Sequence, residues 1–385
     1  MDAEGLVVGA CETTGLDDFG GDPWREGLER YVAAVDAEAD LSELGEVALE
    51  AQITANLLNR LRVTAWWTEH PELADERIER PLVVLGLPRT GTTLVSELLY
   101  RDPANRSLMR WEAGSSVPPP HAAEMATDPR VAEARASADG MDALNPEFKA
   151  IHYEAPDGPT ECVAVLAQDF KSLLWSVIAH VPSYDAWLLE CDERSAYEYH
   201  HDVLALLQSR APGRWALKTP HHCLGVDALV ARYPDARIVM THRDPVTVMG
   251  SVCSLTRSLA GTFSDADHTA SIAETWTTIA QTLVERVMSW RDAHGDDRFV
   301  DVAYDELLDD PVGTVAGVYE HFGEVLSTQA EVDMRRYVAE HPRGEHGHHE
   351  YRLDSLGLQA GALEERFRTY RDRFEIGHEG ARVEG

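Results

Sequence analysis

The sequence has 385 residues, of which 44% are hydrophobic and 26% are charged, as in a globular protein with a substantial core. Aspartate and glutamate number 67 against 34 lysine and arginine residues, so the formal net charge is −33 at pH 7. A field of this sign repels nucleic acids and argues against DNA or RNA as a partner. A salt-rich cytoplasm would favour so acidic a protein, while a GC-rich genome would also replace lysine by arginine.

No stretch reaches the eighteen or so consecutive apolar residues of a membrane span, and the N-terminus lacks the basic and apolar segments of a signal peptide. We therefore expect a cytoplasmic protein without a membrane span. The five cysteines are widely spaced and form no C-x-x-C pair, so we expect reduced, mostly buried thiols.

The first eighty residues are predicted to form a helical extension. Apolar residues recur at three- and four-residue spacing over 24–36 and 45–67, as in amphipathic helices. The run Pro81-Leu-Val-Val-Leu-Gly-Leu87 follows, and its branched apolar residues favour a buried parallel strand.

Residues 81–358 are predicted to form one α/β domain. Its segment 110–213 is irregular and is expected to be an insertion, with helices over 161–178 and 193–209. Beyond it, strands are expected at 215–217, 237–242 and 299–303, alternating with helices at 224–233, 245–259, 269–294 and 312–322. This alternation predicts an α/β, P-loop-like three-layer sandwich with a central parallel sheet. A C-terminal helix and tail are expected over 359–385.

The first strand leads into a phosphate-binding loop, Gly86-Leu-Pro-Arg-Thr-Gly-Thr-Thr93, with a helical pattern behind it. Backbone N–H groups of such a turn and the dipole of the following helix bind phosphate or sulfate. Gly86 and Gly91 have the separation found in nucleoside triphosphatases, but Thr92 stands where those enzymes carry the lysine that binds the β and γ phosphates. The basic side chain of the loop is Arg89.

The segment Arg89-Thr90-Gly91-Thr92-Thr93 resembles the 5′-phosphosulfate motif of the sulfotransferases of bacterial type, which are related to the cytosolic sulfotransferases. The resemblance implies that Arg89, Thr90, Gly91, Thr92 and Thr93 bind 3′-phosphoadenosine-5′-phosphosulfate (PAPS). It further implies that the chain is an enzyme that moves the sulfuryl group of this co-substrate to a hydroxyl acceptor and releases PAP, with no metal required.

A second motif lies in Arg237-Ile-Val-Met-Thr-His-Arg-Asp-Pro245 and the helix behind it. Arg243 ends a strand, where α/β sheets bind ligands, and Ser251 follows eight residues later, about two helical turns on. The pair resembles the 3′-phosphate motif of the sulfotransferases, which distinguishes PAPS from ATP.

Between these motifs, Lys218-Thr-Pro-His-His222 resembles the Lys-Thr-x-His region of the same family. On this register His222 is predicted to be the general base and His221 the second candidate, since imidazole titrates near neutral pH. Lys218 and Arg89 are predicted to stabilise charge on the bridging oxygen.

Two more segments resemble parts of the family. Tyr304, at the end of a strand, is predicted to lie near the adenine, with a core aromatic as the alternative. A segment at 346–358 is predicted to close over the 3′-phosphate through His349 or Arg352. Its three histidines and Glu350 also allow a metal site, but their spacing matches no zinc pattern, and no metal is expected.

The acceptor is predicted to be a small apolar alcohol, phenol or lipid. The insertion at 110–213 is expected to lie on the acceptor side of the domain, and its aromatic and histidine side chains are expected to line the acceptor pocket. They are Trp111, His121, His152, Tyr153, Trp175, Tyr184 and Trp187. Two alternatives remain at this stage, a small-molecule kinase with an altered P-loop and a non-catalytic nucleotide-binding protein. A homo-oligomer is possible.

Overall fold

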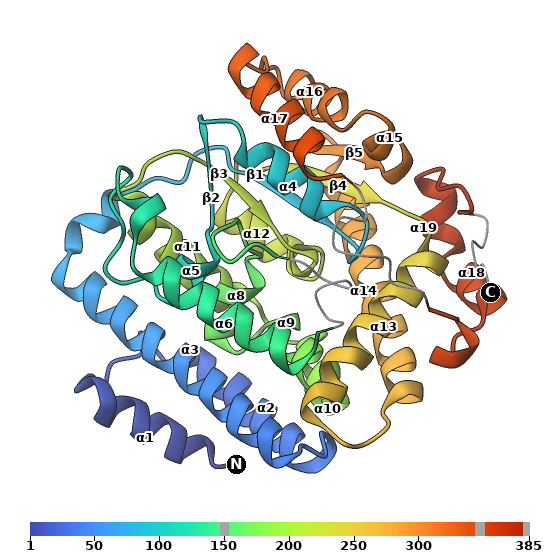
Figure 1. Cartoon of the computed structure of the whole chain (residues 1–385). Helices are drawn as coiled ribbons and strands as arrows, with labels where there is room; N and C mark the ends of the chain where they lie inside the picture. Colours follow the sequence, from blue (N-terminus) through green and yellow to red (C-terminus); the bar gives the residue numbers. More distant parts are fainter. Residues whose placement is uncertain (147–153, 343–350, 380–385) are drawn as a thin grey trace.

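The computed structural model describes residues 1–146, 154–342 and 351–379, and its centre is a parallel sheet of five strands in the order β2-β3-β1-β4-β5. The first strand in the sequence, β1, is therefore the central strand of the sheet. The chain adds β2 and β3 on one side of β1 and then crosses to the other side, where it adds β4 and β5 (Figure 1). The strands are β1 (Leu82–Gly86), β2 (Asn105–Ser107), β3 (Arg214–Lys218), β4 (Arg237–His242) and β5 (Phe299–Ala303).

Helices cover both faces of the sheet because the side chains of β1 alternate between two hydrophobic clusters. Leu82 and Val84 pack with one cluster, and Val83 and Leu85 with the other. The first face carries α4 (Thr92–Tyr100), α15 (Tyr304–Asp309), α16 (Pro311–His321) and α17 (Thr328–Glu340). The second carries α11 (Arg194–Gln208), α12 (Val226–Arg232), α13 (Pro245–Phe263) and α14 (Thr269–His294). The predicted three-layer α/β fold is confirmed.

The N-terminal eighty residues fold into α1 (Ala3–Thr14), α2 (Pro23–Glu38), α3 (Glu43–Glu69) and the short η1 (Pro71–Asp75). The two helices predicted there correspond to α2 and α3. Their buried residues, among them Trp24, Leu28 and Ile53, belong to the hydrophobic cluster that also holds Val83 of β1. The division of the chain at residue 80 stays a prediction, since one hydrophobic cluster spans both parts.

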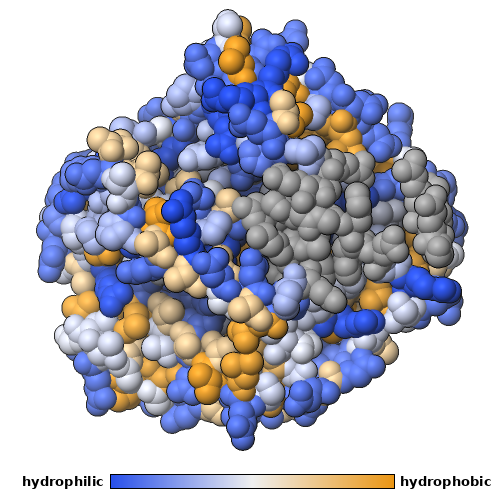
Figure 2. Space-filling model, viewed as in Figure 1, coloured by the Kyte–Doolittle hydropathy of each residue, from blue (hydrophilic) through white to orange (hydrophobic). Residues whose placement is uncertain are grey.

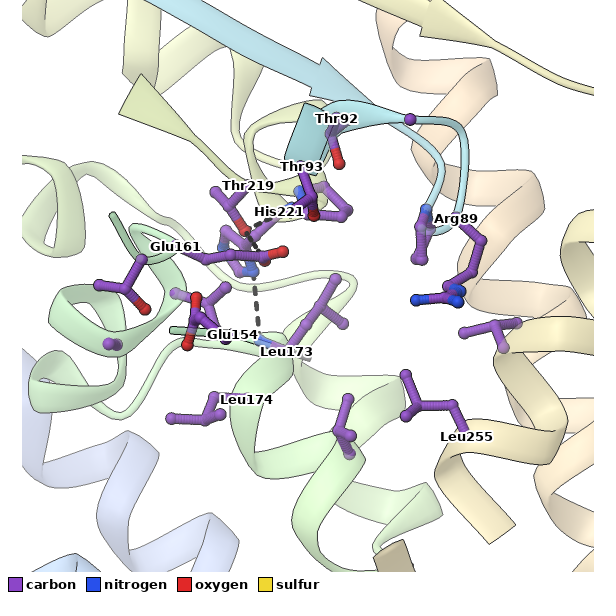
Figure 3. A pocket seen from close by; sticks show the side chains of 18 of the residues that line it. Arg89, Thr92, Thr93, Glu154, Glu161, Leu173, Leu174, Thr219, His221 and Leu255 are labelled. Carbon is purple, nitrogen blue, oxygen red and sulfur yellow. Dashed lines mark hydrogen bonds between the residues drawn. The ribbon is translucent and has the colours of Figure 1, made fainter. Parts of the chain in front are cut away.

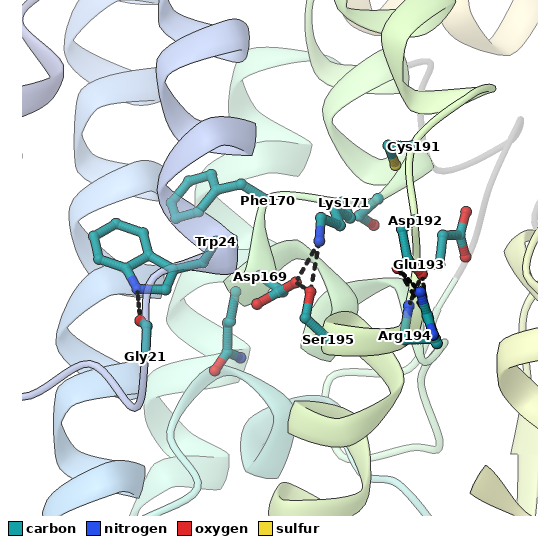
Figure 4. A network of polar contacts seen from close by, with 12 residues as sticks. Gly21, Trp24, Asp169, Phe170, Lys171, Cys191, Asp192, Glu193, Arg194 and Ser195 are labelled. Carbon is teal, nitrogen blue, oxygen red and sulfur yellow. Dashed lines mark hydrogen bonds and ion pairs between the residues drawn. The ribbon is translucent and has the colours of Figure 1, made fainter. Parts of the chain in front are cut away.

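The single helix predicted over 161–178 is wrong. The chain instead forms α8 (Val163–Leu166), η3 (Ala167–Asp169) and α9 (Leu173–Ile178), and Phe170 between them has a left-handed φ of +53°. The bend lets the buried Asp169 carboxylate accept hydrogen bonds from Arg60 of α3 at 2.9 Å and from Ser195 at 2.6 Å. Lys171 donates to the same serine at 2.5 Å (Figure 4). Tertiary polar contacts thus decide the local conformation.

The remaining described helices of the central and C-terminal segments are short except for α6 (Arg130–Leu144), which has 15 residues. The short ones are α5 (Arg110–Gly114), η2 (Met125–Thr127), α10 (Pro182–Leu188), η4 (Pro220–Cys223), η5 (Asp354–Leu356), α18 (Ala360–Arg366) and α19 (Arg368–Arg373). The predicted C-terminal helix is thus two short ones, and Figure 1 shows them beside α13 and α14.

The visible surface is mainly hydrophilic, and its hydrophobic residues form small separate groups (Figure 2). No helix within the described part of the chain is long and apolar enough to cross a membrane.

Candidate active site

The phosphate loop leaves β1 at Gly86 and enters α4 after Gly91, and both glycines have positive φ, +145° and +93°. A Cβ at Gly86 would lie 2.5 Å from the Thr241 carbonyl oxygen, and one at Gly91 would lie 2.7 Å from Leu307 Cδ2. Only glycine fits both the backbone conformation and the space at these two positions. The loop therefore forms a tight turn, and the backbone N–H groups at the N-terminus of α4 lie at the end of this turn.

The side chains of the loop divide into two groups. Thr90 is turned inward, with its hydroxyl 2.7 Å from the Leu87 carbonyl oxygen and 2.6 Å from the Thr241 hydroxyl, so it can offer a ligand only its backbone. Arg89, Thr92 and Thr93 line a cavity instead. Arg89 has a backbone φ of +68°, which residues other than glycine rarely adopt, and such strain is common at binding sites.

The second predicted motif meets the loop in space. Arg89 Nε donates to Ser251 Oγ at 3.1 Å, and Arg243 Nη1 donates to the Arg89 carbonyl oxygen at 3.0 Å. The Arg243 guanidinium stacks over the Tyr304 ring at 4.1 Å from its centroid. The structure thus brings together Arg89, Ser251, Arg243 and Tyr304 from elements more than 200 residues apart in the sequence.

Two like charges lie side by side in this cluster. Burial, followed by the charge of Arg243, lowers the pKa of Arg89. Burial also lowers the pKa of Arg243, but the carboxylate of Glu379 outweighs it and leaves that pKa raised. Glu379 accepts from Arg243 Nε at 2.7 Å and from Nη2 at 2.8 Å, a bidentate contact of the kind that arginine makes with phosphate. Sequence reasoning missed this partner.

His222 does not reach the cavity. Its ring is fully buried, Nδ1 lies 2.8 Å from the Tyr197 hydroxyl, and Nε2 has no hydrogen-bond partner in the described part of the chain. Burial, together with His200 and His221, holds the pKa of His222 well below its ordinary value. A ring in this place is neutral at physiological pH and has no path to a substrate hydroxyl, so the geometry does not support the predicted role of general base.

His221 lines the cavity, but both of its ring nitrogens are engaged. Nδ1 accepts from the backbone N–H of Leu173 at 3.2 Å, and Nε2 lies 3.0 Å from a carboxylate oxygen of Glu193. The Leu173 bond requires a lone pair on Nδ1, so Nε2 carries the proton and donates it to Glu193. The ring therefore fixes the start of α9.

Lys218 ends β3 and is almost fully buried, with 3% of its side chain exposed. Its Nζ donates to Glu161 Oε1 at 2.8 Å, and the Thr219 hydroxyl donates to Glu161 Oε2 at 3.2 Å. Burial lowers the pKa of Lys218, but the carboxylates of Glu161 and Glu154 raise it above its ordinary value. Glu161 lines the cavity and Lys218 does not, which moves the lysine away from its predicted place at the bridging oxygen.

The cavity has a volume of about 370 Å³ and joins the two motifs to an apolar region. Figure 3 shows Glu161 beside Thr219 and His221, with Arg89 across the cavity and Thr92 and Thr93 above. The end near the nucleotide motifs is formed by Pro88, Arg89, Gly91, Thr92, Thr93, Arg243 and Tyr304. The middle is formed by Glu154, Thr160, Glu161, Thr219, Pro220 and His221. The remaining lining residues are apolar, and Figure 3 shows two of them, Leu174 and Leu255, on the side of the cavity away from Thr92 and Thr93, which we call the apolar end. They are Val163, Ala164, Leu173, Leu174, Val177, Val252, Leu255, Leu259 and Trp276.

Of the residues predicted to line an acceptor pocket, those that the structure describes do not line this cavity. Trp175 and Tyr184 are buried in the core, and Trp111 packs against Val131 in a separate cluster. Trp187 packs on Tyr184, and His121 is exposed. His152 and Tyr153 lie outside the described residues. Aromatic side chains fill cores more often than pockets, and the apolar lining of this cavity comes mainly from aliphatic residues of α8, α9 and α13.

The segment that was predicted to close over the 3′-phosphate is described from residue 351 onward. Arg352 is exposed and is not among the cavity residues. Tyr351 instead packs on α13, where its hydroxyl donates to the Thr247 carbonyl oxygen at 2.8 Å. His349 and the histidines beside it lie outside the described residues. Within the described ranges no group of three His, Cys, Asp or Glu side chains is arranged to hold a metal ion.

The fold and the site together define a class of protein. A parallel sheet carries a glycine loop that has Thr92 at the position of the triphosphatase lysine and Arg89 earlier in the loop, and a second arginine, Arg243, directly follows the neighbouring strand β4. Such a site suits a nucleotide with phosphate groups at two places and the transfer of an anionic group.

Comparison with known proteins agrees with this class. Residues 81–327 match the model of a family described as the sulfotransferase family. The crystal structure of sulfotransferase STF9 from Mycobacterium avium superimposes with a TM-score of 0.91 at 36% identity, covering 98% of both chains. That of STF1 from Mycobacterium tuberculosis H37Rv superimposes with a TM-score of 0.86 at 34% identity, covering 96% of this chain and 99% of that one.

A curated relative from Mycobacterium bovis, omega-hydroxy-beta-dihydromenaquinone-9 sulfotransferase Stf3, is 24% identical over 280 residues. The match covers 68% of this chain and 67% of that protein. The chain belongs to the sulfotransferase family and is an enzyme of that family, whose sulfuryl donor is PAPS.

Proposed function

We propose that the enzyme transfers the sulfuryl group of PAPS to the hydroxyl of an apolar acceptor, such as a long-chain or lipid alcohol. The observation that carries this proposal is the single cavity with two unlike ends, one cationic and one formed by nine apolar side chains. A polar hydroxyl and an apolar body are both satisfied if the hydroxyl lies at the junction of the two ends.

The nucleotide is proposed to bind along the cationic end. Backbone N–H groups of residues 90–93 and the Arg89 guanidinium hold the 5′-phosphosulfate, and Arg243 with Ser251 holds the 3′-phosphate. Tyr304 lies beside the adenine. The charges support this arrangement, since the adjacent guanidinium groups of Arg89 and Arg243 repel each other and an anionic ligand would relieve that repulsion.

The acceptor is proposed to bind along the apolar end, with its hydroxyl toward Thr93 and Glu161. Apolar burial contributes about 0.8 kcal/mol per methylene group, a factor of about four in affinity. The name of the mycobacterial Stf3 relative gives a hydroxylated menaquinone, a lipid, as its acceptor, and this supports the same class of acceptor here.

The test uses radiolabelled PAPS with a series of primary alcohols of increasing chain length and with glucose and trehalose as polar acceptors. We expect the label to pass to the alcohols, with KM falling about fourfold per added methylene until the cavity is filled. Label transfer that favours the sugars, or a KM that does not depend on chain length, would refute the apolar acceptor.

A substitution at the apolar end sharpens the test. Leu255→Asp places a charge in this wall and should raise KM for the alcohols without changing the dissociation constant of PAP. The matched control is Val325→Asp, at a position that is 91% exposed, and it should change neither quantity.

A further inference from the structure

Transfer to a hydroxyl requires a proton acceptor that faces the reacting group, and neither histidine of the predicted pair supplies one. His222 lies behind the cavity wall on Tyr197. The unprotonated nitrogen of His221, Nδ1, already accepts a hydrogen bond from the backbone N–H of Leu173, so it is not open to a proton from the acceptor. The base therefore has to come from another cavity residue.

Glu161 presents a carboxylate at the junction of the two ends of the cavity, just before α8 (Figure 3). Its two oxygens are oriented by Lys218 at 2.8 Å and by Thr219 at 3.2 Å, and both partners come from the end of β3 and the turn behind it. A carboxylate has about four acceptor positions and can accept hydrogen bonds from several donors at once, a substrate hydroxyl among them.

The contact with Lys218 also suits a base. Lys218 is buried, with a pKa raised above its ordinary value because Glu161 and Glu154 offset the effect of burial. A cation held 2.8 Å away favours the ionised form of a carboxylate. Glu161 thus combines access to the cavity, a fixed orientation and a neighbouring cation.

We propose that Glu161 is the general base of the transfer reaction, an inference that rests on the proposed function. The acceptor O–H bond breaks and its proton passes to a Glu161 oxygen, while the hydroxyl oxygen forms a bond to sulfur. The bond between sulfur and the 5′-phosphate oxygen breaks, and its electron pair leaves with PAP. Glu161 then returns the proton to water. Lys218 and Thr219 are positioning residues, because they act through this carboxylate.

The decisive experiment compares Glu161→Gln with Glu190→Gln, since Glu190 is exposed and outside the cavity and provides a matched loss of one carboxylate. Titration calorimetry measures PAP binding, and single-turnover transfer from radiolabelled PAPS to dodecanol measures chemistry. We expect Glu161→Gln to bind PAP within about twofold of the unsubstituted enzyme and to lose at least about 100-fold in rate. Glu190→Gln should stay within about threefold.

Two further variants give readouts that a structural role would not move. Glu161→Asp keeps a carboxylate but withdraws it by one methylene, and it should retain an intermediate rate. Lys218→Met removes the cation that keeps Glu161 ionised, so the acid limb of its pH–rate profile should move to higher pH.

The possible failures are distinguishable. If the unsubstituted enzyme neither binds PAP nor transfers the label, the proposed function fails. If it does both and Glu161→Gln keeps a rate within threefold, or if Glu161→Gln loses PAP binding as well, Glu161 is not the base. An equal loss in Glu190→Gln would also overturn the assignment.

Discussion

The contact between Arg243 and Glu379 predicts that the C-terminal segment competes with the nucleotide. Arg243 directs Nε and Nη2 at the Glu379 carboxylate, and these are the donors that the proposed 3′-phosphate would use. The Glu379 backbone N–H also donates to Asp244 at 3.1 Å, which holds the segment in place. Binding of the 3′-phosphate must therefore displace Glu379.

The size of the effect follows from the burial of the pair. The Arg243 and Glu379 side chains are 14% and 26% exposed, so the pair lies between an exposed ion pair, worth up to about 1 kcal/mol, and a fully buried one. A net value of about 1 to 2 kcal/mol is reasonable for this bidentate contact. Its loss in Glu379→Gln should tighten the binding of PAP by roughly 5- to 30-fold.

The assay is titration calorimetry at constant ionic strength with PAP and with adenosine 5′-phosphosulfate, which lacks the 3′-phosphate. Glu379→Gln should bind PAP more tightly and should leave the other ligand unchanged, because only the 3′-phosphate needs Arg243. Glu375→Gln, four residues earlier and exposed, controls for the loss of one negative charge in the same segment.

Two results would contradict the reasoning. Unchanged PAP affinity in Glu379→Gln would mean that the carboxylate does not occupy the site of the 3′-phosphate in solution. An equal gain for both ligands, or an equal gain in Glu375→Gln, would mean that the general charge of the segment acts, and not a specific displacement.

Three further predictions concern the loop, the histidine pair and a buried acid. Gly91→Ala should weaken PAP binding at least about 10-fold, measured by calorimetry, because a residue with a Cβ is strained at the φ of +93° that the loop requires there. His222→Asn should lower Tm but keep the transfer rate within about threefold, and a 100-fold loss in a folded protein would restore His222 as the base. Burial raises the pKa of Asp185 to about 7, so stability should fall as pH rises from about 4 to 7. Asp185→Asn should remove this fall, with a gain of up to about 4 kcal/mol at pH 8 by denaturant unfolding.

The sheet and the nucleotide motifs could be predicted from the sequence because local rules decide them. A run of five buried apolar residues, two glycines in left-handed conformations and an arginine that ends a parallel strand all carry their signal within a few residues. The positions of Arg89 and Arg243 followed from the topology, since parallel strands β1 and β4 are neighbours and end at the same edge. No long-range information was needed for these features.

The base and the acceptor wall could not be predicted in the same way because long-range contacts decide them. The adjacent histidines point in different directions, His221 to Glu193 and His222 to Tyr197. Nothing in the segment from Lys218 to His222 indicates which of the two faces the cavity. Glu161 becomes a site residue only because β3 delivers Lys218 beside it. A single acidic residue in a chain with 67 of them carries no signal of its own.

The paired charges explain how so acidic a protein can admit an anionic donor. Among the described residues of the site, Lys218 is held by Glu161 and Arg243 by Glu379, while Arg89 donates to the neutral hydroxyl of Ser251. The two carboxylates differ in their attachment. Glu161 is fixed between β3 and the turn behind it, whereas Glu379 belongs to a terminal segment after the last helix. An incoming phosphate can therefore replace Glu379 on Arg243 without disturbing Glu161, because the two ion pairs share no residue. On the proposed function, the site would then gain positive potential for the donor at Arg243, while the proposed base Glu161 would stay paired with Lys218.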